Sequence, residues 1–219
     1  MNGVLHTVLQ MIEKGATHVG VATDHVIESF RNGLWPGYKT SAGIEPALFA
    51  QFHPLERALA AMGVVVWPMV ELEADDALAS AAQLAAADAR VQKVCIWTPD
   101  KDLAQCVNGE RVVQMHRKAN KMLDAAAVKE KFGVEPARIP DFLALVGDSA
   151  DGYPGIDGVG PVGAARKRLA TLRSDAKLFA DIDELRWRGP TGAFSSCATE
   201  LGFPSLADRA SKSPRPSAP

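Results

Sequence analysis

The stretch from residue 71 to 102 constrains the fold most, because it joins an Ala-rich helix to a short apolar strand. It reads ELEADDALASAAQLAAADARVQKVCIWTPDKD, and its apolar run Val94–Trp97 predicts a buried strand. A helix followed by a buried strand is half of a crossover unit, which favours a parallel sheet. Acidic residues begin the helix and follow the strand. Ligands of such sheets gather beyond the carboxyl ends of the strands, which is where the second acidic group falls.

Acidic clusters recur at the ends of successive elements. A third cluster lies in the segment GDSAD at 147–151, and another acid follows an earlier apolar strand. Close carboxylates repel one another unless protons or cations neutralise them, and clustered oxygen ligands suit Mg²⁺ or Mn²⁺. Each cluster alone has a structural explanation, as a helix cap or a solvated loop, but their recurrence favours a metal site. The candidate ligands are Asp24, Glu73, Asp75, Asp76, Asp100, Asp102, Asp148 and Asp151.

Composition is that of an ordinary globular protein without a membrane anchor. The 219 residues suit one or two domains, with 47% hydrophobic and 23% charged residues. Three cysteines form no CxxC pair and leave one unpaired, so we expect a reducing, cytoplasmic location. No apolar run reaches membrane-spanning length, and the N-terminus lacks the order of a signal peptide. We expect a monomer.

The net charge does not exclude a nucleic-acid partner. Removing the eight candidate ligands from the formal net charge of −2 leaves +6 on the remaining residues. A modestly basic body around a cation-filled acidic site is compatible with a phosphate-backbone substrate. Since the acids were removed by choice, the charge permits this interpretation without demonstrating it.

Other elements follow from periodicity and from breakers. Apolar spacing predicts helices over 4–12, from Pro46 to Met62, over 124–132, from Pro140 and over 162–172. Strands are expected at 18–23, 64–67 and 111–115, and one helical turn at 103–107. The strands that end near 24, 67 and 97 should share one parallel sheet, buried on both faces.

Two segments have features of nucleic-acid binding. Aromatic residues alternate with basic ones in FRNGLWPGYK at 30–39, which can stack on bases or pack a loop onto the core. The Gly-rich turn at 154–161 precedes a helix, so its backbone could approach a phosphate, although a plain helix–turn–helix loop explains it too.

Taken in order, FR..LWPGYK, EADDALA, TPDKDLAQCV, FGVEPARIPDFLALVGDSADGYPGIDGVG and DELRWRG resemble the bacterial 5′–3′ exonuclease family, related to flap endonucleases and to the nuclease portion of DNA polymerase I. The resemblance covers roughly residues 3–203. It implies an α/β fold, a parallel-sheet PIN/5′-nuclease-like domain with a C-terminal helix–hairpin–helix-like DNA-binding segment. It also implies hydrolysis of DNA phosphodiesters with two Mg²⁺ or Mn²⁺ ions, near 5′ ends, flaps or nicks.

The resemblance also implies roles for individual residues. The eight acids match the family's metal ligands, and Arg31 and Lys39 match basic residues near the scissile phosphate. Tyr38, Gly155, Gly158 and Gly160 match positions that contact DNA. A DNA-junction-binding module without catalysis and an RNA-cleaving relative on the same fold are the alternative functions.

The resemblance predicts a domain division as well. We expect a nuclease core at 1–135, a shortened helical DNA-binding lobe at 136–210 and a disordered tail at 211–219. Family members usually begin with a strand ending in a metal-binding Asp before the helix at 4–12. We therefore expect this chain to lack that strand and to be a shortened form, less stable and less active than a longer one.

Overall fold

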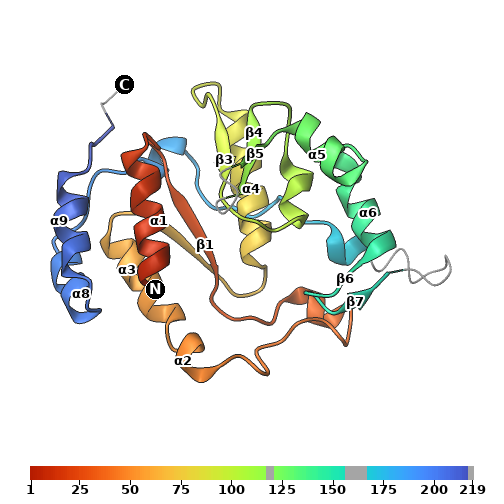
Figure 1. The fold of residues 1–219 in the computed structure, drawn as a ribbon, viewed down its shortest axis with the longest axis horizontal. Coiled ribbons are helices and arrows are strands. Elements are labelled where there is room, and N and C mark those ends of the chain that lie inside the picture. Colours follow the sequence, from red (N-terminus) through yellow and green to blue (C-terminus); the bar gives the residue numbers. More distant parts are fainter. Residues whose placement is uncertain (117–120, 156–166, 217–219) are drawn as a thin grey trace. The chain divides into compact units, whose positions relative to one another are not determined.

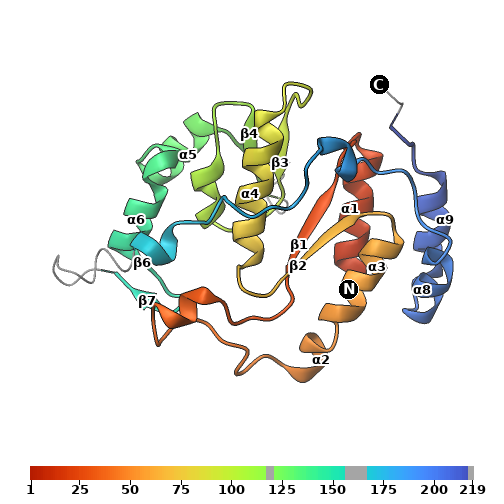
Figure 2. The ribbon, with the colours of Figure 1, turned by 180° about the vertical axis from the view of Figure 1, so that it is seen from behind.

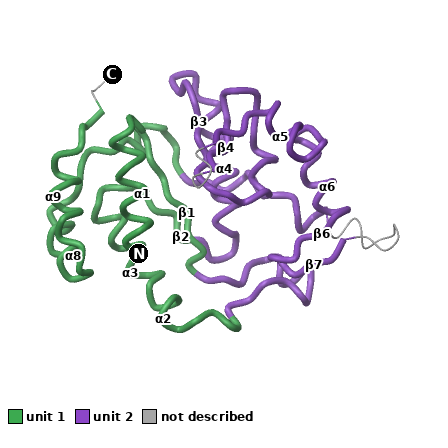
Figure 3. The backbone as a smooth tube through the Cα atoms, in the orientation of Figure 1, with its two compact units in different colours: residues 1–25, 42–68, 179–219 green, residues 26–41, 69–178 purple. Residues whose placement is uncertain are grey.

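The computed structural model describes residues 1–116, 121–155 and 167–216. Their contacts divide them into two compact units that alternate along the chain (Figure 3). Unit 1 comprises residues 1–25, 42–68 and 179–219, and unit 2 comprises residues 26–41 and 69–178. This is a different division from the expected domains, whose boundaries at 135 and 210 stay a prediction.

Unit 1 packs helices against a two-stranded sheet of β1 (Gly20–Asp24) and β2 (Val65–Met69) (Figure 2). Its core joins the apolar face of α1 (Asn2–Glu13) to α3 (Phe52–Ala61), α8 (Phe194–Glu200) and α9 (Pro204–Lys212). The η4 turn (Ile182–Leu185) precedes Trp187, which is fully buried and donates from Nε1 to the Met62 carbonyl at 2.9 Å. The expected opening helix and the strand that follows it are confirmed.

The helix expected from Pro46 to Met62 is two helices, α2 (Pro46–Phe49) and α3, separated by Ala50 and Gln51. Pro54 explains the break. In a continuous helix its ring would clash with the carbonyl of Ala50, and it has no N–H to donate there. In α3 it instead stands at the third position, where an N–H would have no intrahelical partner.

Unit 2 is built on a three-stranded sheet in the order β3 (Val94–Ile96), β4 (Val112–His116) and β5 (Lys121–Leu123). The β3–β4 pair is parallel and the β4–β5 pair is antiparallel. Helix α4 (Ala74–Ala87) precedes β3 in the chain, as Figure 1 shows, and its small side chains Ala79 and Ala82 pack with Ile96 and Val112. The expected helix followed by a buried strand and a parallel strand pair are therefore confirmed, but β2, the strand before α4, lies in a different sheet from β3.

The one sheet expected to contain the strands ending near 24, 67 and 97 is not observed. Within the described residues, β1 pairs with β2, and β3 pairs with β4. The antiparallel strand β5 and the small hairpin of β6 (Gly147–Asp148) and β7 (Tyr153–Pro154) were not expected either. These strands are two or three residues long, too short for hydrophobic alternation to identify them.

The remaining helices of unit 2 enclose a second core. They are η1 (Phe30–Gly33), η2 (Asp102–Cys106), α5 (Ala125–Phe132), η3 (Pro136–Arg138) and α6 (Ile139–Val146). Asp124 caps the start of α5, and Gly133 caps its end with a positive φ of 74°, which suits glycine. The expected helix–hairpin–helix-like segment lies largely outside the described residues, although 167–170 are helical.

Two observations concern the chain's ends and its surroundings. Helix α9 runs through Lys212, so it occupies the first two residues of the segment expected to be a disordered tail. Among the described residues, no helix is both long and apolar enough to cross a membrane. All three cysteines are free thiols. The expected cytoplasmic location and monomeric state stay predictions.

Candidate metal centre

Three carboxylates converge in unit 2. Asp102 begins η2, Asp148 ends β6, and Asp151 lies in the turn between β6 and β7. One ligand atom from each lies within 4.8 Å of the others, which is compact enough for all three to bind one ion. Two of the acidic clusters recognised in the sequence, separated by more than 40 residues, are thus brought together.

Asp102 has the most perturbed environment of the three. Its residue is 5% exposed, and its Oδ1 atom is buried without a hydrogen-bond partner in the described part of the chain. Burial, together with the charges of Asp100, Asp151 and Asp148, raises the pKa of Asp102 to about 8. Buried polar atoms normally have partners. A buried carboxyl group with an unpartnered oxygen, next to two other carboxylates, fits a divalent cation, so the residues present suit the implied metal.

Two lysines neutralise part of this negative charge. The Lys39 Nζ atom lies 3.1 Å from Glu73 Oε2 and 3.3 Å from Asp151 Oδ1. The Lys101 Nζ atom lies 3.0 Å from Asp148 Oδ2. Burial, with the charges of Glu73 and Asp148, still raises the pKa of Asp151 against the opposing effect of Lys39. The two lysines therefore do not fully neutralise the negative charge of the carboxylates.

Arg31 forms a buried ion pair. Its side chain is 1% exposed and forms a two-pronged ion pair with Asp76, at 2.7 Å for both Nη1–Oδ2 and Nη2–Oδ1. It also donates from Nε to the Leu169 carbonyl at 3.0 Å. Because its guanidinium is buried and hydrogen-bonded to Asp76 and Leu169, Arg31 presents no exposed surface in this structure. The structure shows a buried ion pair with Asp76, and the expected position of Arg31 near the scissile phosphate stays a prediction.

Both carboxylate oxygens of Asp76 also have hydrogen-bond partners. Besides the pair with Arg31, its Oδ2 accepts the Glu73 backbone N–H at 3.0 Å, and its Oδ1 accepts the Arg173 backbone N–H at 2.8 Å. It is fully buried. Its Oδ2 caps the start of α4, so the capping role that the sequence left open is observed for Asp76.

Tyr38 does not present its ring for base stacking. It is 3% exposed within the core of unit 2, and its hydroxyl donates to Glu73 Oε2 at 3.1 Å. Gly155 likewise has a packing reason to be glycine, because a Cβ there would lie 2.6 Å from the Val146 carbonyl oxygen. Gly158 and Gly160 fall outside the described residues, so their predicted contact with DNA stays a prediction.

The other predicted ligands surround the three carboxylates less closely or lie elsewhere. Glu73 is buried and accepts the Ser29 hydroxyl at 2.5 Å in addition to its contacts with Tyr38 and Lys39. Asp75 is half-buried, and Asp100 is exposed, with its Oδ1 accepting the Asp102 backbone N–H at 3.0 Å. Asp24 ends β1 in unit 1, and its role as a ligand stays a prediction.

Three residues of the site were not recognised from the sequence. Lys101 stands between two predicted ligands, so its position in Asp-Lys-Asp was a usable signal. Tyr153 is 1% exposed, and its hydroxyl has no hydrogen-bond partner among the described residues. Burial and the charges of Asp102 and Asp148 raise its pKa. Gln114 donates from Nε2 to the carbonyls of Thr98 and Asp100, which fixes the segment after β3. The last two have no local sequence signal.

The described part of unit 2 is thus an α/β unit with a parallel strand pair and a candidate metal centre. The family described as 5′-3′ exonuclease, N-terminal resolvase-like domain, matches residues 1–133, which is more than half of the chain. The chain belongs to this family, and the resemblance found in its motifs is confirmed.

Named relatives are consistent with this membership. DNA polymerase I of Pseudomonas aeruginosa is 35% identical over 197 residues, covering 88% of this chain and 21% of that protein. A 5′-3′ exonuclease of Aquifex aeolicus is 35% identical over 161 residues, covering 73% of this chain and 55% of that protein. The chain thus spans about a fifth of the polymerase and about half of the exonuclease.

Solved structures share the fold. A T5 5′-exonuclease with bound divalent metal ions (zinc) aligns with a TM-score of 0.57 at 17% identity, covering 95% of this chain and 82% of that one. A T5 flap endonuclease in a pseudo-enzyme–product complex with DNA and metal ions aligns with a TM-score of 0.55 at 15% identity, with the same coverage. The 5′-nuclease-like fold class expected from the sequence is confirmed.

Proposed function

We propose that this protein is a metal-dependent 5′–3′ exonuclease and structure-specific flap endonuclease that hydrolyses DNA phosphodiesters. The observation that carries the proposal is the convergence of Asp102, Asp148 and Asp151, together with a buried oxygen of Asp102 that has no hydrogen-bond partner among the described residues. Family membership supports it, as does the name 5′-3′ exonuclease of relatives from Aquifex and Buchnera. The solved T5 complex with DNA and metal ions points to the same substrate class.

The three carboxylates would hold a divalent ion, and we propose Mg²⁺, with Mn²⁺ as a substitute. All three donors are hard oxygens without a nitrogen or sulfur ligand, which suits these ions. A bound ion would supply positive charge for the phosphate and a water of lowered pKa. Glu73, Asp75 and Asp100 are the candidates for a second ion.

Lys39 is the residue that we expect to contact the scissile phosphate of the DNA. Its side chain is 28% exposed, and its amine lies between Glu73 and Asp151, at the edge of the carboxylate cluster. An amine there offsets negative charge that develops on the phosphate during hydrolysis. Arg31 acts indirectly in this proposal, by holding Asp76 and with it the first turn of α4 that carries Glu73.

The test is cleavage of 5′-labelled flap and nicked DNA duplexes with Mg²⁺, against the same reactions with EDTA. We expect Mg²⁺-dependent cleavage by the parent, which Asp148→Asn abolishes. Glu110→Gln, which removes an exposed carboxylate of the same unit, should leave cleavage unchanged. A parallel RNA flap identifies the substrate class. Binding of flap DNA without Mg²⁺-dependent cleavage, or full activity of Asp148→Asn, would refute the proposal.

A further inference from the structure

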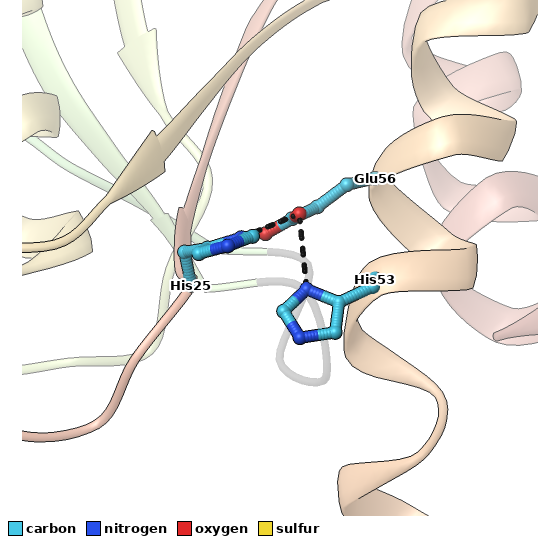
Figure 4. Close-up of side chains that lie close together, drawn as sticks. All are labelled: His25, His53 and Glu56. Carbon is cyan, nitrogen blue, oxygen red and sulfur yellow. Dashed lines mark hydrogen bonds and ion pairs between the residues drawn. The ribbon is translucent and has the colours of Figure 1, made fainter.

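A second group of metal-ligating side chains lies in unit 1. It consists of His25, His53 and Glu56, and one ligand atom from each lies within 4.8 Å of the others (Figure 4). His53 and Glu56 are three residues apart on α3, so they project from the same face of the helix. His25 immediately follows β1 and reaches the same carboxylate from the strand side.

The spacing of these atoms is close to that required by a small transition-metal ion. The His25 Nδ1 atom lies 2.9 Å from Glu56 Oε2, and the His53 Nδ1 atom lies 3.7 Å from the same oxygen. Tetrahedral ligands at Zn–N and Zn–O bond lengths of about 2.1 Å stand about 3.4 Å apart. The two observed distances lie on either side of this value.

The carboxylate of the group is held in place. Glu56 is 9% exposed, and its Oε1 accepts the Thr23 hydroxyl at 2.6 Å, which leaves Oε2 for the two histidines. Burial would raise the pKa of Glu56, but the hydrogen bonds from Thr23 and His25 outweigh it, so its pKa lies below the usual value. A carboxylate oriented by a hydrogen bond to its other oxygen is typical of metal sites.

The group is open to solvent on its histidine side. The side chains of His25 and His53 are 36% and 50% exposed, so an ion can enter. Thr23 and His25 are two residues apart at the end of a strand and both contact Glu56, which places them on the α3 side.

We propose that His25, His53 and Glu56 form a site for Zn²⁺, or for another divalent transition metal that prefers imidazole. Two imidazole nitrogens and one carboxylate oxygen are a donor set for such ions, whereas Mg²⁺ prefers oxygen ligands. Three protein ligands leave the fourth position to water. The ion joins the end of β1 to α3, so its effect is to stabilise unit 1. The site does not depend on the proposed nuclease function.

Zn²⁺ titration by calorimetry, with Mg²⁺ in large excess to occupy the carboxylates of unit 2, tests the proposal. We expect one tight Zn²⁺ site in the parent, and Zn²⁺ should raise the melting temperature. Loss of a protein ligand in His53→Ala or His25→Ala should weaken binding by more than about 100-fold, because even an indirect partner of a metal contributes 10- to 100-fold. His53 is half-exposed, so its replacement should leave the fold intact, as circular dichroism will verify.

Two control variants separate this site from other zinc binding. His116→Ala removes a histidine of unit 2, and Asp148→Asn alters the acidic centre, and both should bind Zn²⁺ like the parent. Co²⁺ in place of Zn²⁺ should give a visible absorption spectrum that disappears in His53→Ala. Equal Zn²⁺ affinity of the parent and His53→Ala, or no tight Zn²⁺ binding by the parent with Mg²⁺ present, would overturn the proposal.

Discussion

Asp102 should make the stability of the metal-free protein depend on pH. Its pKa is about 8 in the folded state, against about 3.9 for an unperturbed Asp in the unfolded chain. Between these values the folded state keeps a proton that the unfolded state loses, so deprotonation favours unfolding. The stability from this group is complete below about pH 4 and is lost as the pH rises through about 8.

The size of the effect follows from the two pKa values. Each pKa unit corresponds to about 1.4 kcal/mol, so the free energy of unfolding should fall by roughly 5 kcal/mol at most across this window. Asp102→Asn keeps the side-chain volume and removes the ionisable proton. In EDTA the variant should be more stable than the parent near pH 8 and similar to it near pH 4. A divalent ion should remove the same slope from the parent, because it stabilises the carboxylate form.

Urea unfolding in EDTA, at a series of pH values from about 4 to 8, measures this effect. The difference between parent and Asp102→Asn isolates the one carboxyl group from the histidines that titrate in the same range. Glu110→Gln, an exposed carboxylate of unit 2, is the matched control and should follow the parent. If the free energy of unfolding changed with pH in the same way for the parent and Asp102→Asn, the carboxyl group of Asp102 would have no raised pKa. The argument for a cation there would then fail.

Three further variants separate structure from chemistry. Arg31→Ala should lower the free energy of unfolding by about 3–5 kcal/mol, since it leaves Asp76 buried and unpaired; a urea midpoint like the parent's would contradict this. Lys39→Ala should change the free energy of unfolding by less than about 1 kcal/mol. It should lower kcat for flap cleavage more than it weakens DNA binding. Weaker DNA binding with an unchanged kcat would refute the proposed role of Lys39. Gly155→Ala should cost about 1–3 kcal/mol in urea unfolding, because its Cβ meets the Val146 carbonyl, and parental stability would exclude that contact.

Local sequence patterns were sufficient where a local force decides the structure. The apolar spacing of residues 4–12 predicted α1, because one face of that helix is buried as a unit. The apolar run at Val94 predicted β3, and the acids after it were correctly expected to meet those near Asp148. The break before α3 was also available from the sequence, since Pro54 forbids a continuous helix.

Long-range partners could not be inferred in the same way. The pairing of Arg31 with Asp76 joins residues 45 positions apart, and nothing in either local sequence distinguishes a buried ion pair from a phosphate contact. Tyr38 had two possible surroundings, and its burial depends on α6 and η2 packing around it. The group of His25, His53 and Glu56 was missed because isolated histidines carry little information until the fold brings them together.

Exposure divides the cations of the acidic centre into two kinds. Arg31 is 1% exposed and Asp76 is fully buried, so separating them would leave an uncompensated charge in the interior. Lys39 and Lys101, at 28% and 36% exposure, are partly exposed, so their amines can move when another cation takes their place. The buried pair of Arg31 and Asp76 therefore holds the first turn of α4 in place. We expect the two lysines to act as exchangeable counter-ions, which pair with Glu73, Asp148 and Asp151 until a divalent ion binds.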